Sequence, residues 1–281
     1  MELLKDAIML YDLYEPVAEL QPYIAAFWAQ EKSAASFSAN ILLPDSYLEL
    51  IMTIGPSSTW ELENGEQIEA PRANLVGLQR EPFRVRATGD FRAIGIHLYA
   101  WGVRPLVGKQ INLDATHIPL DESWQNLALE VEWMVENYGY AEAIAHLQLF
   151  VAKVYRRSDI DVTPVRNAGT LLQAANGQLG IYDLANQCYI SPSQLQRSFK
   201  EYMGVSPKTY ARIVRFEAIR DRLLANPLYP TADLVNEFGY ADQAHFIRDF
   251  KAFTTQTPRE FAAHASQQSE YSRDAVFLQS F

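Results

Sequence analysis

The sequence predicts an α+β fold in which a strand-rich N-terminal part precedes an all-helical C-terminal part. Three observations support this prediction: short alternating runs up to about residue 98, apolar residues at helical spacing after Trp101, and one local pattern that occurs twice within the last hundred residues. Because 281 residues are typical of two domains, we expect one domain at 1–163, a second at 164–264 and a C-terminal tail at 265–281.

The strand-rich part is indicated by alternation and by turn residues. Apolar or alternating runs predict strands at residues 41–43, 48–54, 83–87 and 93–98. The pair Asn64-Gly65 separates two further short runs. Both residues of this pair tolerate positive φ, so a β-hairpin is expected there.

The period of the apolar residues changes after Trp101. Their spacing predicts two helices, at about 124–138 and 144–154, with Gly139 between them. The polar stretch that follows ends at Pro164, and we place the domain boundary there.

The formal net charge of −10 is distributed unevenly along the chain. Residues 1–163 carry 12 Lys and Arg against 23 Asp and Glu, a net charge of −11. Residues 164–264 carry 11 against 9, a net charge of +2. Local charge rather than total charge governs attraction to phosphate, so the acidic N-terminal part does not exclude a C-terminal part that binds DNA.

The composition excludes several classes of protein. The single cysteine, Cys188, rules out an internal disulfide framework and a cysteine-based zinc cluster, and we expect it to be a small core residue. The first ten residues lack the pattern of a signal peptide, and no run reaches the roughly 18 apolar residues of a membrane helix. We therefore expect a cytoplasmic protein that does not bind membranes.

The repeated pattern is a short amphipathic helix, a tight turn and a second helix, at residues 181–200 and again at 231–251. Ser191 and Asp242 are placed to cap the second helix of each copy, with Pro192 at a first helical position. Two such helix-turn-helix patterns about 50 residues apart are a stronger signal than one.

Each second helix has one apolar face and one polar face. Leu195 and Phe199 are four residues apart, as are Phe246 and Phe250, which predicts that these pairs are buried. The opposite faces carry Arg and Gln, whose donors and acceptors match base edges in the major groove, and Lys, which suits phosphates. The predicted DNA contacts are Ser193, Gln196, Arg197, Lys200, Gln243, Ala244, His245, Ile247, Arg248 and Lys251, together with Lys208 at the start of the next helix.

These motifs resemble the DNA-binding domain of AraC-type (AraC/XylS) transcriptional regulators. The run from Asp183 to Pro207 is similar to its first half, and the run from Phe238 to Phe261 to its second half. The resemblance implies seven helices, with a long central helix at about 207–225 that holds the two motifs in successive turns of the major groove. It also implies a sequence-specific regulator of transcription.

Two positions depart from the usual pattern of this family. Tyr189 in the first turn and Thr255 before the last helix stand where glycine is common. A side chain is awkward there if φ is positive, so both turns are expected to be unusual.

The N-terminal part resembles the sensor half of a subgroup of these regulators, through residues 42–51 and 95–102. This resemblance implies a small cupin-like β-barrel followed by helices. A small barrel holds one small ligand, and the predicted effector-binding residues are Tyr47, Arg84, Arg86, Tyr99 and Trp101. The alternative is that the aromatic residues belong to the core and the arginines are solvated.

A cupin-type metal-dependent enzyme fused to a DNA-binding module is the alternative function. That chemistry requires two histidines one residue apart and a third metal ligand, and the five histidines, at 97, 117, 146, 245 and 264, lack this spacing. A serine nucleophile elbow and a phosphate-binding glycine loop are also absent from the sequence. We therefore expect no enzymatic activity, no metal and no cofactor.

The expected partners follow from the resemblance and from the helices. They are double-stranded DNA, a small-molecule effector, RNA polymerase in the case of an activator, and a second copy of the chain through the helices near 121–154.

Overall fold

The computed structural model describes residues 8–32, 40–55, 59–61, 67–69, 71–81, 83–87, 90–113, 115 and 117–267. The chain divides into two compact units. Unit 1 comprises Met1–Asn40, Tyr47–Gly77 and Arg84–Val162, and unit 2 comprises Thr163–Phe281 with two short segments, Ile41–Ser46 and Leu78–Phe83. Unit 2 therefore contains residues from both parts of the sequence.

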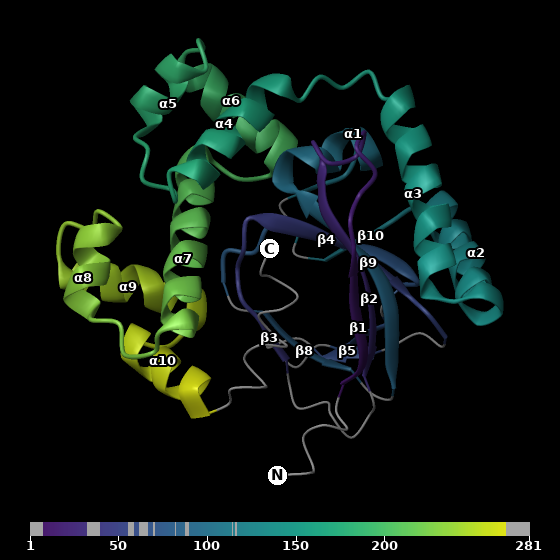
Figure 1. The fold of residues 1–281 in the computed structure, drawn as a ribbon. Helices are drawn as coiled ribbons and strands as arrows, with labels where there is room; N and C mark the ends of the chain where they lie inside the picture. Colours follow the sequence, from purple (N-terminus) through teal and green to yellow (C-terminus); the bar gives the residue numbers. More distant parts are fainter. Residues whose placement is uncertain are drawn as a thin grey trace. The chain divides into compact units, whose positions relative to one another are not determined.

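An antiparallel six-stranded sheet is the centre of unit 1 (Figure 1). Its strands, in spatial order, are β1 (Ile8–Tyr14), β2 (Ile24–Lys32), β9 (Phe91–Tyr99), β4 (Tyr47–Thr53), β7 (Ala73–Val76) and β10 (His117–Pro119). Leu50 of β4 lies opposite Ile96 of β9 and Leu75 of β7, and all three side chains are fully buried. Because side chains alternate along a strand, these residues define one apolar face of the sheet.

A smaller sheet contains β3 (Asn40–Leu42), β8 (Phe83–Ala87), β5 (Thr59–Glu61) and β6 (Gln67–Glu69), in that order. Strands β5 and β6 are antiparallel, with Trp60 opposite Ile68. The predicted hairpin pairing is thus confirmed, whereas its turn at Asn64-Gly65 lies outside the described residues.

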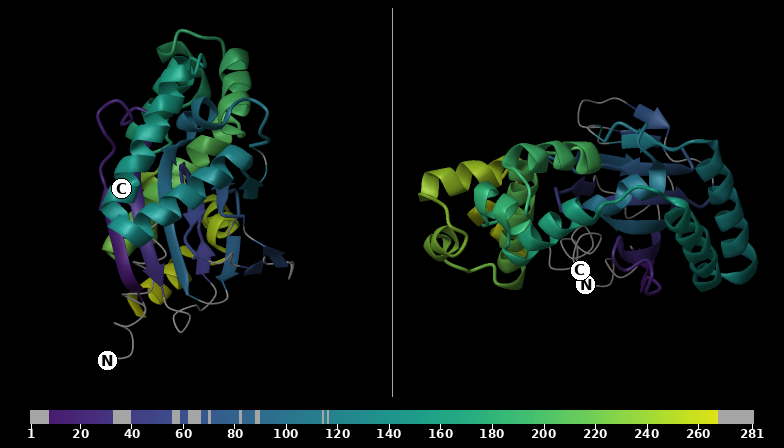
Figure 2. Two further views of the ribbon diagram at one scale, coloured as in Figure 1. Left: turned by 90° about the vertical axis from the view of Figure 1, so that its right-hand side faces the viewer. Right: turned by 90° about the horizontal axis from the view of Figure 1, so that it is seen from above.

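Helices α2 (Glu122–Tyr138) and α3 (Tyr140–Arg157) lie against the six-stranded sheet (Figures 1 and 2). Asp121 caps the start of α2 by accepting hydrogen bonds from the amides of Ser123 and Trp124. Gly139, at φ 98°, separates the two helices as predicted. A 3-10 turn, Ala100–Gly102, and helix α1 (Val103–Val107) follow β9.

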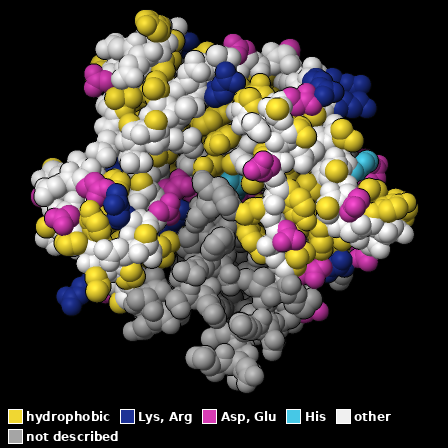
Figure 3. Space-filling model, viewed as in Figure 1, with side chains coloured by type: hydrophobic (Ala, Val, Ile, Leu, Met, Phe, Trp, Pro, Cys, Tyr) yellow, Lys and Arg dark blue, Asp and Glu magenta, His cyan; other side chains and the backbone are white. Residues whose placement is uncertain are grey.

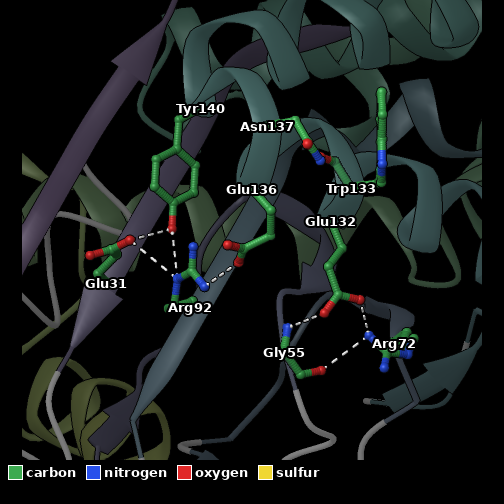
Figure 4. A network of polar contacts seen from close by, with 9 residues as sticks. All are labelled: Glu31, Gly55, Arg72, Arg92, Glu132, Trp133, Glu136, Asn137 and Tyr140. Atoms are coloured by element: carbon green, nitrogen blue, oxygen red, sulfur yellow. Dashed lines mark hydrogen bonds and ion pairs between the residues drawn. The ribbon is translucent and has the colours of Figure 1, made fainter.

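Hydrogen bonds and ion pairs join α2 and α3 to the strands and to the residues beside them (Figure 4). Glu132 of α2 forms an ion pair with Arg72 and accepts the Gly55 amide at 2.9 Å. Arg92 of β9 forms an ion pair with Glu136, at 2.6 Å from Nη1 to Oε1. Arg92 also contacts Glu31 and the Tyr140 hydroxyl, so its guanidinium is engaged on this side of the sheet.

Unit 2 is helical apart from its two N-terminal segments. The described residues form seven helices there, α4 (Thr163–Ala174), α5 (Ile181–Gln187), α6 (Pro192–Met203), α7 (Pro207–Ala225), α8 (Thr231–Glu237), α9 (Gln243–Thr254) and α10 (Pro258–Gln267). This agrees with the expected seven helices and with the expected long helix at 207–225. Phe216 of α7 stacks on Phe253 and lies edge-on to Phe250, so the long helix is the centre of a buried aromatic cluster.

The predicted α+β class is confirmed, with strands in the N-terminal part and helices in the C-terminal part. Strands β1, β2, β7 and β10 were not predicted. Strand β7 is only four residues long and buried on both faces, so it shows no alternation, and β10 has three residues including Pro119. Within the described part of the chain, no helix has both the length and the apolar composition to cross a membrane.

Candidate nucleic-acid interface

Helices α5 and α6 form the first helix-turn-helix. Leu184 of α5 and Leu195 and Phe199 of α6 are completely buried, as their spacing predicted. Ser191 caps α6: its hydroxyl accepts the Gln194 amide, and the Gln194 side chain accepts the Ser191 amide in return. This capping box satisfies amide groups that have no partner within the helix and so fixes where α6 begins.

The turn before α6 has an uncommon backbone conformation. Tyr189 has φ 55°, the left-handed region that glycine adopts without strain, and its side chain is 96% exposed. Since the side chain makes no buried contact, packing does not compensate for the strain.

The face of α6 opposite its buried residues is open to solvent. Ser193, Gln196, Arg197 and Lys200 are all exposed. The Lys200 ammonium lies 3.2 Å from the carbonyl oxygen of Gly204, which follows the helix. Lys200 therefore lies at the C-terminal end of α6, whereas Ser193 and Gln196 lie nearer its start.

Helices α8 and α9 repeat this arrangement. Asp242 caps α9 by accepting the His245 amide at 2.7 Å, and Phe246 and Phe250 are buried. Five predicted contact residues of α9 are exposed: Gln243, Ala244, His245, Arg248 and Lys251. Ile247, by contrast, is only partly exposed because it packs against the core of this half of the unit.

Thr255 ends α9 with φ 62°, and its amide donates to the Lys251 carbonyl at 2.8 Å. The two positions where glycine is usual, Tyr189 and Thr255, thus both adopt the left-handed conformation. The turns keep their geometry without glycine.

Helix α7 connects the two helix-turn-helix pairs and is joined directly to α9. Asp249 of α9 forms an ion pair with Arg212 of α7 and accepts the Tyr240 hydroxyl at 3.0 Å. Burial, together with the negative charge of Asp249, raises the pKa of the Tyr240 phenol, so this hydroxyl stays protonated as a donor. At the start of α7, Ser206 caps the helix and Lys208 is exposed.

The two N-terminal segments of unit 2 contact its helices. The Ser46 amide donates to Glu217 of α7 at 3.3 Å, and the Ser46 hydroxyl accepts Gln173 of α4 at 3.3 Å. Arg80 donates to the Gly204 carbonyl, at the end of α6, at 3.1 Å. The sequence analysis did not anticipate these contacts, because they join residues more than 120 positions apart.

Arg220 of α7 is the largest fully buried side chain in unit 2. Its Nε donates to Asp221 at 2.9 Å, and Glu217 lies 3.9 Å from its Nη2. Burial lowers the pKa of Arg220, but the charges of Asp221, Glu217 and Asp45 outweigh burial and raise it, so the guanidinium is charged inside the unit.

The predicted effector-binding residues lie in unit 1. Tyr99 stacks on Trp101, with ring centroids 4.8 Å apart, and Trp101 is buried and donates to the Pro22 carbonyl at 2.8 Å. Tyr47 is partly exposed and packs against the His97 ring at 4.2 Å. Arg84 and Arg86 belong to β8, and their side chains lie outside what the structure describes.

Comparison with known proteins identifies this arrangement of helices. Residues 184–264 match a family described as a helix-turn-helix domain. The chain is 30% identical over 89 residues to the arabinose operon regulatory protein of Escherichia coli, a match that covers 32% of this chain and 30% of that protein. The C-terminal unit is an AraC-type DNA-binding domain.

Other similarities extend around and beyond the AraC-type domain. The chain is 30% identical over 94 residues to the bifunctional transcriptional activator/DNA repair enzyme AdaA of Bacillus subtilis, covering 34% of this chain and 44% of that protein. Residues 12–118 match a domain of unknown function (DUF6597). A crystal structure of ToxT from Vibrio cholerae with bound unsaturated fatty acid aligns over 89% of this chain and 96% of that chain, with 11% identity and a TM-score of 0.48.

The chain spans about a third of the length of the arabinose operon regulatory proteins that it matches. This similarity therefore concerns the AraC-type domain, and the activity of the whole chain is a separate question.

Proposed function

We propose that the chain is a sequence-specific DNA-binding regulator of transcription of AraC type, in which α6 and α9 enter successive turns of the major groove. Arg197 and Arg248, with Gln196 and Gln243, contact base edges. The lysines of these helices and Lys208 contact phosphates. Ser193, Ala244 and His245 lie on the same faces and complete the contact surface, whereas Ile247 contributes mainly to the core.

The observation that carries this proposal is the pair of exposed polar faces on two capped helices joined by α7. A helix of 19 residues is about 28 Å long. Successive major-groove turns on one side of DNA lie about 34 Å apart. Helix α7 is therefore long enough to hold two recognition helices of one chain at neighbouring turns of the major groove.

Ion pairing inside unit 2 supports the same surface. Asp and Glu side chains of the unit pair with Arg212, Arg220 and Arg222, all of which lie on α7. Among the described residues, Arg197 and Arg248 form no ion pair and are exposed. They are therefore available for DNA even though the domain has a net charge of only +2.

Unit 1 would then be the regulatory part, which binds a small effector and performs no catalysis. In the described part of the chain, no group of three or more His, Cys, Asp and Glu side chains is placed to hold a metal ion. No described feature favours the metal-dependent enzyme over a sensor. If the regulator is an activator, RNA polymerase is its further partner.

A second copy of the chain is the proposed partner of α2 and α3. Leu129 and Trp133, four residues apart on α2, are 48% and 56% exposed, and Leu149 of α3 is 73% exposed. Figure 3 shows apolar side chains at the surface of this helix pair, at the right of the view. Sedimentation of wild type and of Trp133→Ser tests this contact; a wild-type monomer at all concentrations would rule it out.

Selection of DNA from a random library by the purified full chain tests the main proposal. We expect enrichment of a motif with two parts about 10 base pairs apart, centre to centre, as neighbouring major-groove turns require. The double variant Arg197→Ala/Arg248→Ala is expected to lose this enrichment. No enrichment by a folded wild-type protein would overturn the proposal.

A further inference from the structure

The two faces of the six-stranded sheet differ in chemistry. On the face towards α2 and α3, Leu48, Leu50 and Met52 of β4 are fully buried. On the other face, Tyr47, Glu49 and Ile51 of the same strand are partly exposed. This second face carries polar side chains from four neighbouring strands, Gln30, Glu49, Thr53, Asn74 and His97, and we refer to it as the polar face.

An ordered cluster occupies the middle of the polar face. Glu49 accepts a hydrogen bond from the Trp28 indole at 2.9 Å and a second from Nδ1 of His97, which lies directly opposite on β9. Gly95 leaves room for the Trp28 ring, because a Cβ atom there would lie 2.0 Å from it. Both acceptor oxygens of Glu49 are therefore already engaged, and the orientations of Trp28 and His97 are fixed.

Three polar atoms around this cluster are buried without a hydrogen-bond partner among the described residues: Gln30 Nε2, Thr53 Oγ1 and Asn74 Oδ1. Their residues are at most 2% exposed. Gln30 of β2 and Thr53 of β4 both lie opposite Ala93 of β9, from the two sides of that strand. Asn74 of β7 lies opposite Ile51 of β4. Buried polar groups are nearly always paired in folded proteins, so these three atoms have hydrogen-bonding capacity that a bound molecule can satisfy.

We propose that the polar face binds a small uncharged molecule that carries both hydrogen-bond donors and acceptors, such as a compound with several hydroxyl or amide groups. The proposal rests on the proposed sensor function of unit 1 and specifies its ligand class. Asn74 Oδ1 requires a donor, Gln30 Nε2 requires an acceptor, and Thr53 Oγ1 can pair with either. The aromatic rings of Trp28 and Tyr47 supply apolar surface beside these groups.

Charge and polarity argue against the other ligand classes. An anion would lie near the Glu49 carboxylate, and none of the described side chains of the polar face is Lys or Arg. Both oxygens of the Glu49 carboxylate already accept hydrogen bonds, from Trp28 and His97, so this group is not free to bind a cation. An alkyl chain would leave Gln30, Thr53 and Asn74 unpaired, which is costly for buried polar groups.

A matched pair of threonines tests whether the polar face is built for a ligand. Thr53 and Thr254 are 2% and 3% exposed, but the Thr254 hydroxyl donates to the Phe250 carbonyl at 3.0 Å, whereas the Thr53 hydroxyl has no described partner. Without ligand, Thr53→Val should leave the unfolding temperature of unit 1 unchanged or higher, and Thr254→Val should lower that of unit 2. An equal decrease in both variants would show that Thr53 has a structural partner and would overturn the site.

Thermal unfolding of the full chain with defined probes tests the ligand class. We expect at least one of D-glucose, xylitol and uracil to raise the unfolding temperature of wild type, and that shift to be lost in Thr53→Val or Asn74→Leu. Stabilisation by oleate or spermidine instead, or by none of the neutral probes, would overturn the ligand class. DNA binding without probe should be the same in wild type and Thr53→Val, so failure of the ligand class and failure of DNA recognition are separate results.

Discussion

The guanidinium of Arg80 donates a hydrogen bond of 3.1 Å to the carbonyl oxygen of Gly204, the residue that ends the first recognition helix. Arg80 comes from the segment Leu78–Phe83, which follows β7 and Gly77 in the chain but belongs to the DNA-binding unit. The Lys200 ammonium donates to the same carbonyl at 3.2 Å, so this oxygen accepts from two side chains. One side chain from the N-terminal part of the sequence therefore stabilises the end of α6.

Removing this contact should loosen the end of α6. We expect Arg80→Ala to lower the free energy of unfolding of unit 2 by about 0.5–1.5 kcal/mol, the usual net value of one hydrogen bond. Amide hydrogen exchange should accelerate in the last turn of α6. Glu81→Ala, a change at the neighbouring exposed residue, is the control, and equal exchange rates in both variants would contradict the structural role of Arg80.

Loss of either arginine from the exposed recognition faces should weaken specific binding. We expect Arg197→Ala and Arg248→Ala each to cost about 1–3 kcal/mol of affinity for the selected DNA, or roughly 5- to 150-fold, because each would remove a proposed base contact. Fluorescence anisotropy measures this change. The charge-matched control is Lys153→Ala, which removes one exposed positive charge from α3. Affinity equal to wild type in both arginine variants would remove α6 and α9 as recognition helices.

The exposed lysines should contribute through phosphate rather than through sequence. Lys208→Ala and Lys251→Ala are each expected to weaken binding to specific and unrelated DNA by the same factor. The slope of log K against log salt should become shallower by about one unit, because one counterion fewer is released. If either variant changes the preferred sequence instead, that lysine contacts a base.

The left-handed turn at Tyr189 should tolerate glycine with a gain in stability. Its φ of 55° strains any L-residue, and its exposed ring loses no packing when it is removed. We expect Tyr189→Gly to raise the free energy of unfolding by about 0.5 kcal/mol, after the entropy cost of glycine is subtracted. Denaturant titration tests this against Gly204→Ala, at φ 77°, which should be destabilising; a less stable Tyr189→Gly would show that the ring has a structural contact.

A fragment of residues 164–264 should bind DNA as a monomer over two turns of the duplex but unfold more easily than unit 2 in the full chain. The fragment lacks Ser46, a partner of Glu217 and Gln173, and Asp45, whose charge acts on buried Arg220. We expect a loss of about 1–3 kcal/mol in the free energy of unfolding. Footprinting and denaturant titration of the fragment and the full chain measure both properties; equal stability would show that these contacts contribute nothing.

The sequence alone determined the buried faces and the starts of the helices in the two helix-turn-helix pairs. The buried pairs Leu195/Phe199 and Phe246/Phe250 follow from helical spacing, and the starts of α6 and α9 follow from the caps Ser191 and Asp242. A cap and a period of 3.6 residues depend only on neighbours in sequence. For the same reason the polar faces opposite these residues, and with them the candidate DNA contacts, could be predicted from the sequence.

The tertiary structure decided where distant residues meet. Nothing near Arg80 or Ser46 in the sequence indicates a bond to α6, α7 or α4, because such contacts depend on how the whole chain packs. The polar face likewise exists only through strand register, which places Glu49 opposite His97 and sets Gln30 and Thr53 on either side of Ala93. A shift of one residue in that register would turn these polar groups to the apolar face, so the pairing of the strands, rather than the residues alone, creates the proposed ligand site.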